Sequence, residues 1–276
     1  MKRWSAAAFG ALAGAMLVYP GEAAEAAWQG MMLWARAVAP VLGPFMACML
    51  MITSRLSGGP WLRVALSWLG GSPGGARLMQ GMNLTGRDAV RYAAMTGTMS
   101  PMFFLGTVSA WLGDAVAGRI ILLCHIAGAL LLGLCVKKTG DTPAPACQPM
   151  PLGTALRESA LALLTVALCM MLGCVAARMA SCAFPELPPS AAAALQCALE
   201  VTAGVKALIE WPGTYTAPLV CAACSFGGLS LLLQNAAFWQ DSGVTLSQLF
   251  FLRLLHAMLS GALCFLVFQG LTSVVY

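Results

Sequence analysis

Two glycine-rich stretches, Ser72-Pro-Gly-Gly-Ala-Arg-Leu-Met-Gln80 and Ser225-Phe-Gly-Gly-Leu-Ser-Leu-Leu-Leu-Gln234, interrupt long apolar runs of this chain. Lipid cannot hydrogen-bond the backbone groups that such a break releases, so a break at membrane depth needs protein or water around it. Paired breaks are typical of secondary transporters that are built from two repeats. The sequence therefore predicts two repeats, each with a broken or re-entrant helical hairpin.

The composition is that of an integral membrane protein. Apolar residues make up 60% of the 276 positions, charged residues 9%, and the mean hydropathy is +0.82. The length holds roughly seven to nine crossings of about 20 residues, which leaves no room for a sizeable soluble domain. The net charge of +5 is spread over short loops, so it indicates membrane topology and no nucleic-acid partner. We expect an all-α polytopic membrane protein.

Apolar runs predict the membrane segments. The expected segments are residues 5–19, 37–53, 61–69, 89–111, 119–136, 159–177, 191–209, 214–239 and 249–267. The run 61–69 is too short to span and fits one arm of a re-entrant hairpin, and the interrupted run 214–239 is interpreted in the same way. Residues 1–26 imitate a cleavable signal peptide, but we expect an uncleaved first helix.

A proline-rich segment divides the chain. Residues 139–151 contain four prolines and are incompatible with the interior of a helix. We therefore expect an N-terminal membrane repeat in residues 1–138 with the first hairpin, this linker, and a C-terminal membrane repeat in residues 152–276 with the second hairpin. Lys137 and Lys138 precede the linker and predict that it is cytoplasmic. The relative orientation of the repeats is left open.

The first break supplies candidate substrate-binding residues. Ser72, Gly74 and Gly75 allow the backbone to approach a ligand closely. Arg77 has two interpretations, a ligand for a carboxylate or phosphate and a marker of the cytoplasmic mouth of the hairpin.

A further irregular element is Thr96-Gly-Thr-Met-Ser-Pro101. Pro101 disfavours helical geometry at Ser100 and removes a backbone donor. Thr98 and Ser100 then either satisfy the freed carbonyls or line a polar cavity, so they are candidate site residues together with Pro101.

The second half offers the remaining candidates. Glu200 is an acid inside a predicted membrane segment, where ionisable residues are costly and usually functional, so we expect it to bind a ligand, an ion or a proton. The alternative is an interfacial helix on which Glu200 faces water. Gln234 and Asn235 carry amides that suit a heteroaromatic or carboxylate ligand, or cap the hairpin. Gly227 and Gly228 form the second break itself.

The sequence indicates no metal site, no cofactor and no catalytic residue. Cys221 and Cys224 have CxxC spacing, but no second pair follows, so packing is favoured over zinc binding or redox chemistry. His125, His256 and Arg253 are interpreted as packing or mouth residues. No nucleophile with a base and no pair of carboxylates recurs at catalytic spacing, so we expect a protein that is not an enzyme.

Several motifs follow the order found in a known family. The chain resembles the YlbJ-type sporulation integral membrane proteins, which carry the nucleoside recognition or Gate domain, in Pro40-Val-Leu-Gly-Pro-Phe-Met, Ser72-Pro-Gly-Gly-Ala, Ser100-Pro-Met-Phe-Phe-Leu-Gly-Thr-Val, Leu199-Glu-Val-Thr-Ala-Gly, Ser225-Phe-Gly-Gly-Leu-Ser and Leu252-Arg-Leu-Leu-His-Ala-Met-Leu-Ser. The similarity covers about residues 40–260. One departure is Ser72, which stands where the family has the tyrosine of its G-Y-P motif.

The resemblance implies a multi-spanning protein that moves a small molecule, and in spore formers the family is linked to dipicolinate passage across the outer forespore membrane. The site positions that it implies are Ser72 to Gly75, Ser100, Pro101, Glu200, Gly204, Gly227, Gly228 and Gln234. The missing tyrosine removes a stacking surface and leaves the substrate open.

The expected function is transport or facilitated passage of a small anionic or heterocyclic metabolite, dipicolinate-like or nucleoside-like, in a bacterial cytoplasmic or forespore membrane. The expected partners are the lipid bilayer and the small-molecule solute, while a coupling ion and a homo-oligomer are left open. The alternative is a non-transport membrane scaffold or recognition protein in envelope or spore assembly, in which the glycines only allow close helix packing.

Overall fold

A computed structural model describes residues 2–55, 59–80, 82, 84–140, 149–210 and 213–275, and over these ranges the chain is helical with no strand. The predicted linker includes residues 141–148, which lie outside the described residues, so the division into two repeats at this point stays a prediction. We refer to residues 2–140 as the first half and to residues 149–275 as the second half.

The helices of each half follow in chain order. The first half contains α1 (Lys2–Val18), α2 (Pro20–Leu33), η1 (Trp34–Val38), α3 (Ala39–Thr53), α4 (Pro60–Gly70), α5 (Gly74–Gln80), α6 (Gly86–Thr96), η2 (Phe103–Val108), α7 (Ser109–Leu112) and α8 (Ala115–Cys135). The second half contains α9 (Leu152–Ala183), α10 (Pro189–Leu199), α11 (Val201–Ile209), α12 (Thr216–Phe226), α13 (Gly228–Trp239), η3 (Gln240–Ser242) and α14 (Leu246–Val275).

Long apolar helices confirm an all-α polytopic membrane protein. In the described part of the chain four helices are long and apolar enough to cross a bilayer: Ala115–Cys135, Leu152–Ala183, Thr216–Trp239 and Leu246–Leu271. A fifth would be the pair Pro20–Val38 and Leu42–Thr53, which is bent by 57°. On α9, Glu158 and Arg178 are separated by about 30 Å at 1.5 Å per residue, which matches the thickness of the hydrocarbon core.

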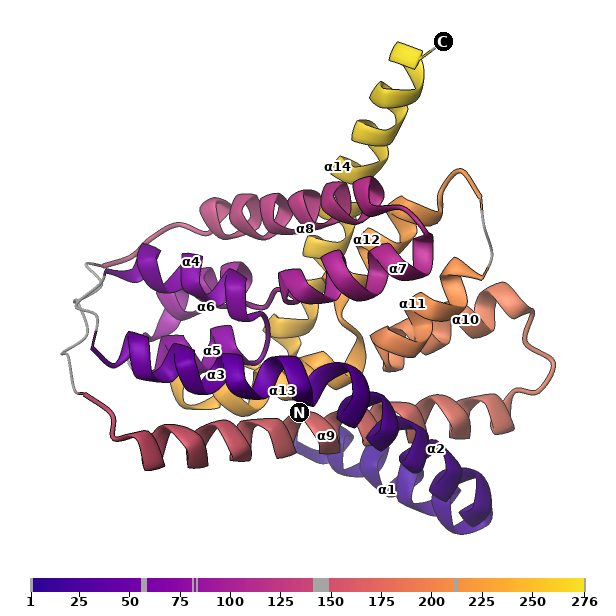
Figure 1. Ribbon diagram of the computed structural model, residues 1–276. Coiled ribbons are helices and arrows are strands. Elements are labelled where there is room, and N and C mark those ends of the chain that lie inside the picture. Colours follow the sequence, from indigo (N-terminus) through magenta and orange to yellow (C-terminus); the bar gives the residue numbers. More distant parts are fainter. Residues whose placement is uncertain are drawn as a thin grey trace.

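The same order of elements occurs in both halves. From α3 in the first half and from α9 in the second half, a pair of short helices follows, then a broken helix, and then a long helix (α8 or α14). The short pairs are α4–α5 and α10–α11, and the arms of each pair pack against each other. In Figure 1 the chain enters α4 from the left edge of the molecule and α10 from the right edge, so the two hairpins open toward opposite ends.

This arrangement corrects where the second hairpin lies. The run 214–239 does not fold back: α12 and α13 together form one candidate span, interrupted at Gly227. The hairpin of the second half is α10–α11, which the sequence predicts as the unbroken membrane segment 191–209. In the second half, the turn at Glu200 is therefore the counterpart of the glycine-rich stretch 72–80. In the first half, the interruption after Thr96 is the counterpart of the stretch 225–234.

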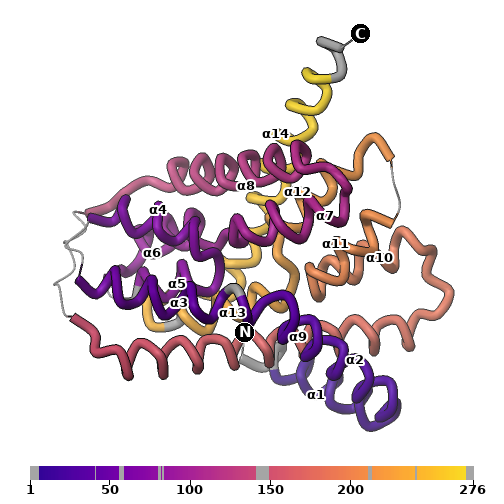
Figure 2. Tube along the Cα trace, in the orientation of Figure 1, coloured from indigo at the N-terminus to yellow at the C-terminus, as the bar shows by residue number. Residues whose placement is uncertain are grey.

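Two apolar cores join the halves. One packs α4, α5 and α6 against α13 and α14, with Met95, Trp239 and Leu249 at its centre. The other packs η2 and α8 against α11, α12 and α14, with Phe104 and Val220 fully buried. Figure 2 shows along the trace how α14 of the second half runs among helices of the first half. The halves therefore form one packed body around their interrupted helices.

Candidate functional site

Four interruptions of helices within the described residues shape the candidate site. We call them break 1 (residues 71–73, between α4 and α5), break 2 (residues 97–100, after α6), break 3 (Glu200, between α10 and α11) and break 4 (Gly227, between α12 and α13). Breaks 1 and 3 are the hairpin turns, and breaks 2 and 4 divide the broken helices. Each break leaves backbone groups that need a partner away from water.

Break 1 is held by break 2. Gly71 has a φ of +66°, which favours glycine, and a Cβ at this position would overlap the backbone of Ser100. The Gly71 N–H donates to Ser67 O at 2.8 Å, and the Ser72 N–H donates to Thr98 O at 2.6 Å. The backbone donor that the first hairpin releases is thus satisfied by the neighbouring broken helix.

Break 3 is satisfied by its own side chain. The Glu200 N–H closes α10 by donating to Gln196 O at 2.7 Å, and the carboxylate accepts the Ala203 N–H at 2.8 Å as the N-cap of α11. Gly204 lies directly against the backbone of Cys197, so the two arms are in close contact. One residue therefore ends one helix, begins the next and places a carboxylate at the turn.

Break 4 fits against break 3. Gly227 and Gly228 have φ angles of +82° and +68°, so two successive residues adopt the left-handed region. A Cβ on Gly228 would lie 2.9 Å from Cys197 O and 3.2 Å from Val201 N. The glycine pair thus both interrupts the helix and lets the second hairpin approach it.

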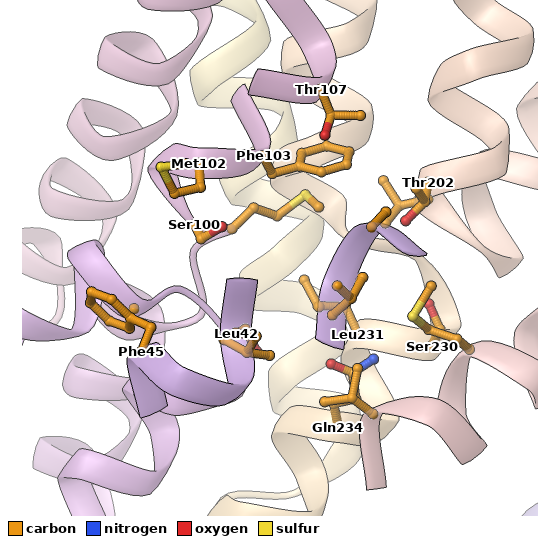
Figure 3. A pocket seen from close by; sticks show the side chains of 18 of the residues that line it. Leu42, Phe45, Ser100, Met102, Phe103, Thr107, Thr202, Ser230, Leu231 and Gln234 are labelled. Carbon is orange, nitrogen blue, oxygen red and sulfur yellow. The ribbon is translucent and has the colours of Figure 1, made fainter. Parts of the chain in front are cut away.

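A pocket lies where these elements meet. Its open volume, counted together with the space at its mouth, is about 900 Å³. Its polar side chains are Ser72, Ser100, Thr107, Glu200, Thr202, Ser230 and Gln234, and its apolar lining includes Leu42, Phe45, Met99, Met102, Phe103, Met170 and Leu231. Figure 3 shows Ser100, Met102 and Phe103 facing Thr202, Ser230 and Gln234 across the space.

The electrostatics of the pocket are set by one acid. Glu200 is 1% exposed, and among the described residues it forms no ion pair. The described lining contains no lysine, arginine or histidine. A buried carboxylate without a counter-ion is costly, so the pocket favours either a neutral Glu200 or a bound group that supplies positive charge or hydrogen-bond donors.

The structure brings part of the predicted site together. Ser72, Ser100, Glu200 and Gln234, which lie far apart in sequence, all line the pocket. Asn235 lies directly behind it, because its Oδ1 accepts the Ser72 hydroxyl at 2.8 Å.

Other predicted residues shape the breaks without lining the pocket. Gly75 packs against the carbonyl of Thr96, and Thr98 is fully buried with its carbonyl bound to Ser72. Pro101 opens the helical turn that leads into η2. Gly204, Gly227 and Gly228 make the close contacts described above.

Arg77 lies away from the pocket. Its guanidinium forms an ion pair with Glu158 of α9, and both side chains are about one-third exposed. Arg77 and Gly74 instead border a small apolar cavity next to Met46. The arginine therefore ties α5 of the first half to α9 of the second half, and no arginine lines the pocket in the described residues.

Sequence reasoning missed three polar lining residues, Thr107, Thr202 and Ser230, and the apolar walls. Thr202 and Ser230 lie within the motifs already quoted, two residues after Glu200 and Gly228 respectively, so proximity to a break was the available signal. Proximity to a break does not single out Met99, Phe103 or Met170, because an apolar residue in a membrane segment has many other roles.

The described residues hold no group of three or more His, Cys, Asp or Glu side chains that is placed to bind a metal ion. Cys221 and Cys224 are buried within the packed helices. Comparison of the chain with protein-family models, with curated proteins and with solved structures finds no match.

Proposed function

We propose that this membrane protein is a transporter or facilitator, and that its pocket binds a small heterocyclic or anionic metabolite as it crosses the bilayer. The observation that carries the proposal is the meeting of the four interrupted elements around one pocket between the two halves, into which seven polar side chains project. Irregular backbone at membrane depth is typical of substrate sites in secondary transporters.

The arrangement of the hairpins supports access from two sides. The α4–α5 hairpin and the α10–α11 hairpin open toward opposite ends of the molecule, yet Ser72 at the tip of one and Glu200 at the tip of the other line the same pocket. A movement of either hairpin would uncover the pocket toward its own side. This geometry suits alternating access to a fixed site.

The lining favours an uncharged heterocyclic solute over an anion. Arg77, the predicted anion ligand, is paired with Glu158 outside the pocket, and the pocket carries Glu200. A planar heterocycle would fit between the methionine and phenylalanine side chains, while Gln234 and Glu200 provide donors and acceptors for its edge. The family resemblance adds dipicolinate and nucleosides to the solutes to be tested.

Uptake into proteoliposomes tests the proposal. We expect purified protein to take up a radiolabelled nucleobase or nucleoside, and Glu200→Gln to reduce this uptake about tenfold or more, since a buried site group that loses its partner costs about 1.4 kcal/mol or more. Glu210→Gln is the matched control, because Glu210 is an exposed acid at the end of the same hairpin.

Three outcomes are informative. Uptake that is lost in Glu200→Gln and kept in Glu210→Gln supports the proposal. Uptake that exceeds empty liposomes for dipicolinate alone would move the substrate to the anionic class. Absence of uptake and of thermal stabilisation by nucleobases, nucleosides and dicarboxylates would overturn the proposal in favour of the scaffold role.

A further inference from the structure

A chain of buried polar side chains lies behind the pocket and connects break 2 with break 4. It consists of Arg253 and His256 on α14, His125 on α8 and Ser225 at the end of α12, each at most 1% exposed. None of the four lines the pocket. Charged and polar groups at this depth are costly, which calls for a specific role.

Arg253 caps a helix of the other half. Its guanidinium donates to Ala93 O at 3.0 Å and Ala94 O at 2.8 Å, and also to Gly97 O. These carbonyls belong to the C-terminal end of α6, where the helix stops and its last acceptors lack partners. A Cβ on Gly97 would lie 2.8 Å from the guanidinium carbon, so glycine at this position makes room for the arginine.

The hydrogen bonds of the two histidines continue from Arg253, and each has a defined donor and acceptor. Arginine only donates, so the 3.2 Å contact between Arg253 Nη1 and His256 Nδ1 makes Nδ1 an acceptor and leaves the hydrogen on Nε2. That Nε2–H donates to the carbonyl of His125 at 2.8 Å. The rings of the two histidines lie 4.8 Å apart.

His125 links the two breaks directly. Its Nε2 accepts the backbone N–H of Met99 in break 2 at 3.0 Å, which leaves the hydrogen on Nδ1. This Nδ1–H therefore donates to the Ser225 hydroxyl at 2.8 Å, two residues before break 4. One imidazole thus holds break 2 with one nitrogen and the end of α12 with the other. Of the two interpretations, packing residues and mouth residues, the full burial of this group agrees with packing and not with a mouth.

We infer that Arg253, His256 and His125 are positioning residues that couple break 2 to break 4 and hold the pocket wall formed by Met99 and Ser100. Removing the hydrogen bond between His125 and Ser225 should then change how exposed the side chain at position 100 is, although Ser225 does not touch Ser100. The biological meaning of this coupling rests on the proposed function. The test below needs no transported solute, so the two can fail separately.

The test measures how fast a cysteine at position 100 reacts with a small membrane-impermeant thiol reagent. The parent carries Ser100→Cys in a background in which Cys48, Cys135, Cys147, Cys174 and Cys182 are alanine, while the buried cysteines of the core are kept. Labelling is counted only in monodisperse protein, so misfolded material does not contribute.

Three variants remove or keep the hydrogen bond between His125 and Ser225. Ser225→Ala removes the acceptor of His125 Nδ1–H. His125→Gln places an amide near the position of Nε2, where its oxygen accepts the Met99 N–H, and leaves no donor at the position of Nδ1. We expect each to change the labelling rate about fivefold, with no further change in the double variant, because they break the same bond. Ser225→Thr keeps the hydroxyl and should restore the parental rate.

The matched control is Ser159→Ala. Ser159 is also a buried serine, but its hydroxyl donates only within α9, to Ala155 O. Its labelling rate should equal that of the parent. Parental labelling in both Ser225→Ala and His125→Gln would overturn the inference, and so would equal changes in Ser225→Thr and Ser225→Ala, since then the hydroxyl is not what matters.

Discussion

The two hairpins perform the same task with different chemistry. In the α4–α5 hairpin three residues leave the helix, and the released Ser72 N–H donates to Thr98 O of the neighbouring broken helix. In the α10–α11 hairpin a single residue, Glu200, makes the turn, and its own carboxylate caps the second arm. The first hairpin therefore depends on its neighbour, whereas the second satisfies itself.

This difference shows which hairpin is freer to move. Every hydrogen bond that a moving element leaves behind at membrane depth must be replaced, because lipid offers none. The first hairpin would lose its bond to break 2, and also the ion pair from Arg77 to Glu158. The second hairpin carries its cap with it and touches break 4 through glycine contacts. We therefore expect the second hairpin to be the mobile one.

The largest expected effect comes from Gly71→Ala. The residue would need a left-handed φ, and its Cβ would overlap the backbone of Ser100, so we expect a loss of about 3 kcal/mol in the free energy of unfolding. Gly204→Ala in the other hairpin has overlap without a left-handed φ, so its loss should be smaller. Gly106→Ala is the control, since nothing lies within 4 Å of the added Cβ.

Reversible unfolding in mixed micelles measures these differences. If Gly71→Ala costs no more than Gly204→Ala, break 1 is not the tighter of the two turns. A clear loss in Gly106→Ala would mean that alanine is unfavourable in this region for reasons unrelated to the breaks.

A smaller effect separates Glu200→Ala from Glu200→Gln. Both remove the charge, but only glutamine keeps an oxygen that accepts the Ala203 N–H. We expect the alanine variant to be about 1 kcal/mol less stable than the glutamine variant, the usual value of an N-cap. Equal stabilities in the same unfolding assay would show that the second hairpin does not depend on its own side chain.

The sequence predicted the class of fold and the existence of broken helices, because hydropathy and glycine or proline content act locally. It placed the second hairpin wrongly, since a turn made by one glutamate between apolar helices has no glycine or proline signal. The stretch around Gly227 has a strong glycine signal, yet the glycines there permit close packing against Cys197 and Val201. Local composition does not distinguish these two uses.

The candidate site was predicted in part for the same reason. Ser72, Ser100 and Glu200 lie within breaks, Gln234 follows break 4 on α13, and all four line the pocket. Arg77 was a plausible anion ligand until its partner Glu158, 81 residues away in sequence, was known. Pairings over such distances, like that between Arg253 and the end of α6, follow from tertiary packing and leave no local pattern.

The smallest expected effect tests whether the tip of the first hairpin is also tied to α13 of the second half. Asn235 Nδ2 donates to Leu231 O at 2.9 Å, which orients Oδ1 toward the Ser72 hydroxyl at 2.8 Å. Ser72→Ala removes this bond but leaves the backbone bond to Thr98, so its cost should be about 1 kcal/mol. In a double-mutant cycle with Asn235→Ala, the coupling energy should be about 0.5–1 kcal/mol. A coupling near zero would mean that the Ser72 hydroxyl does not help to hold the tip of the first hairpin, which would then depend on the backbone bond from Ser72 to Thr98.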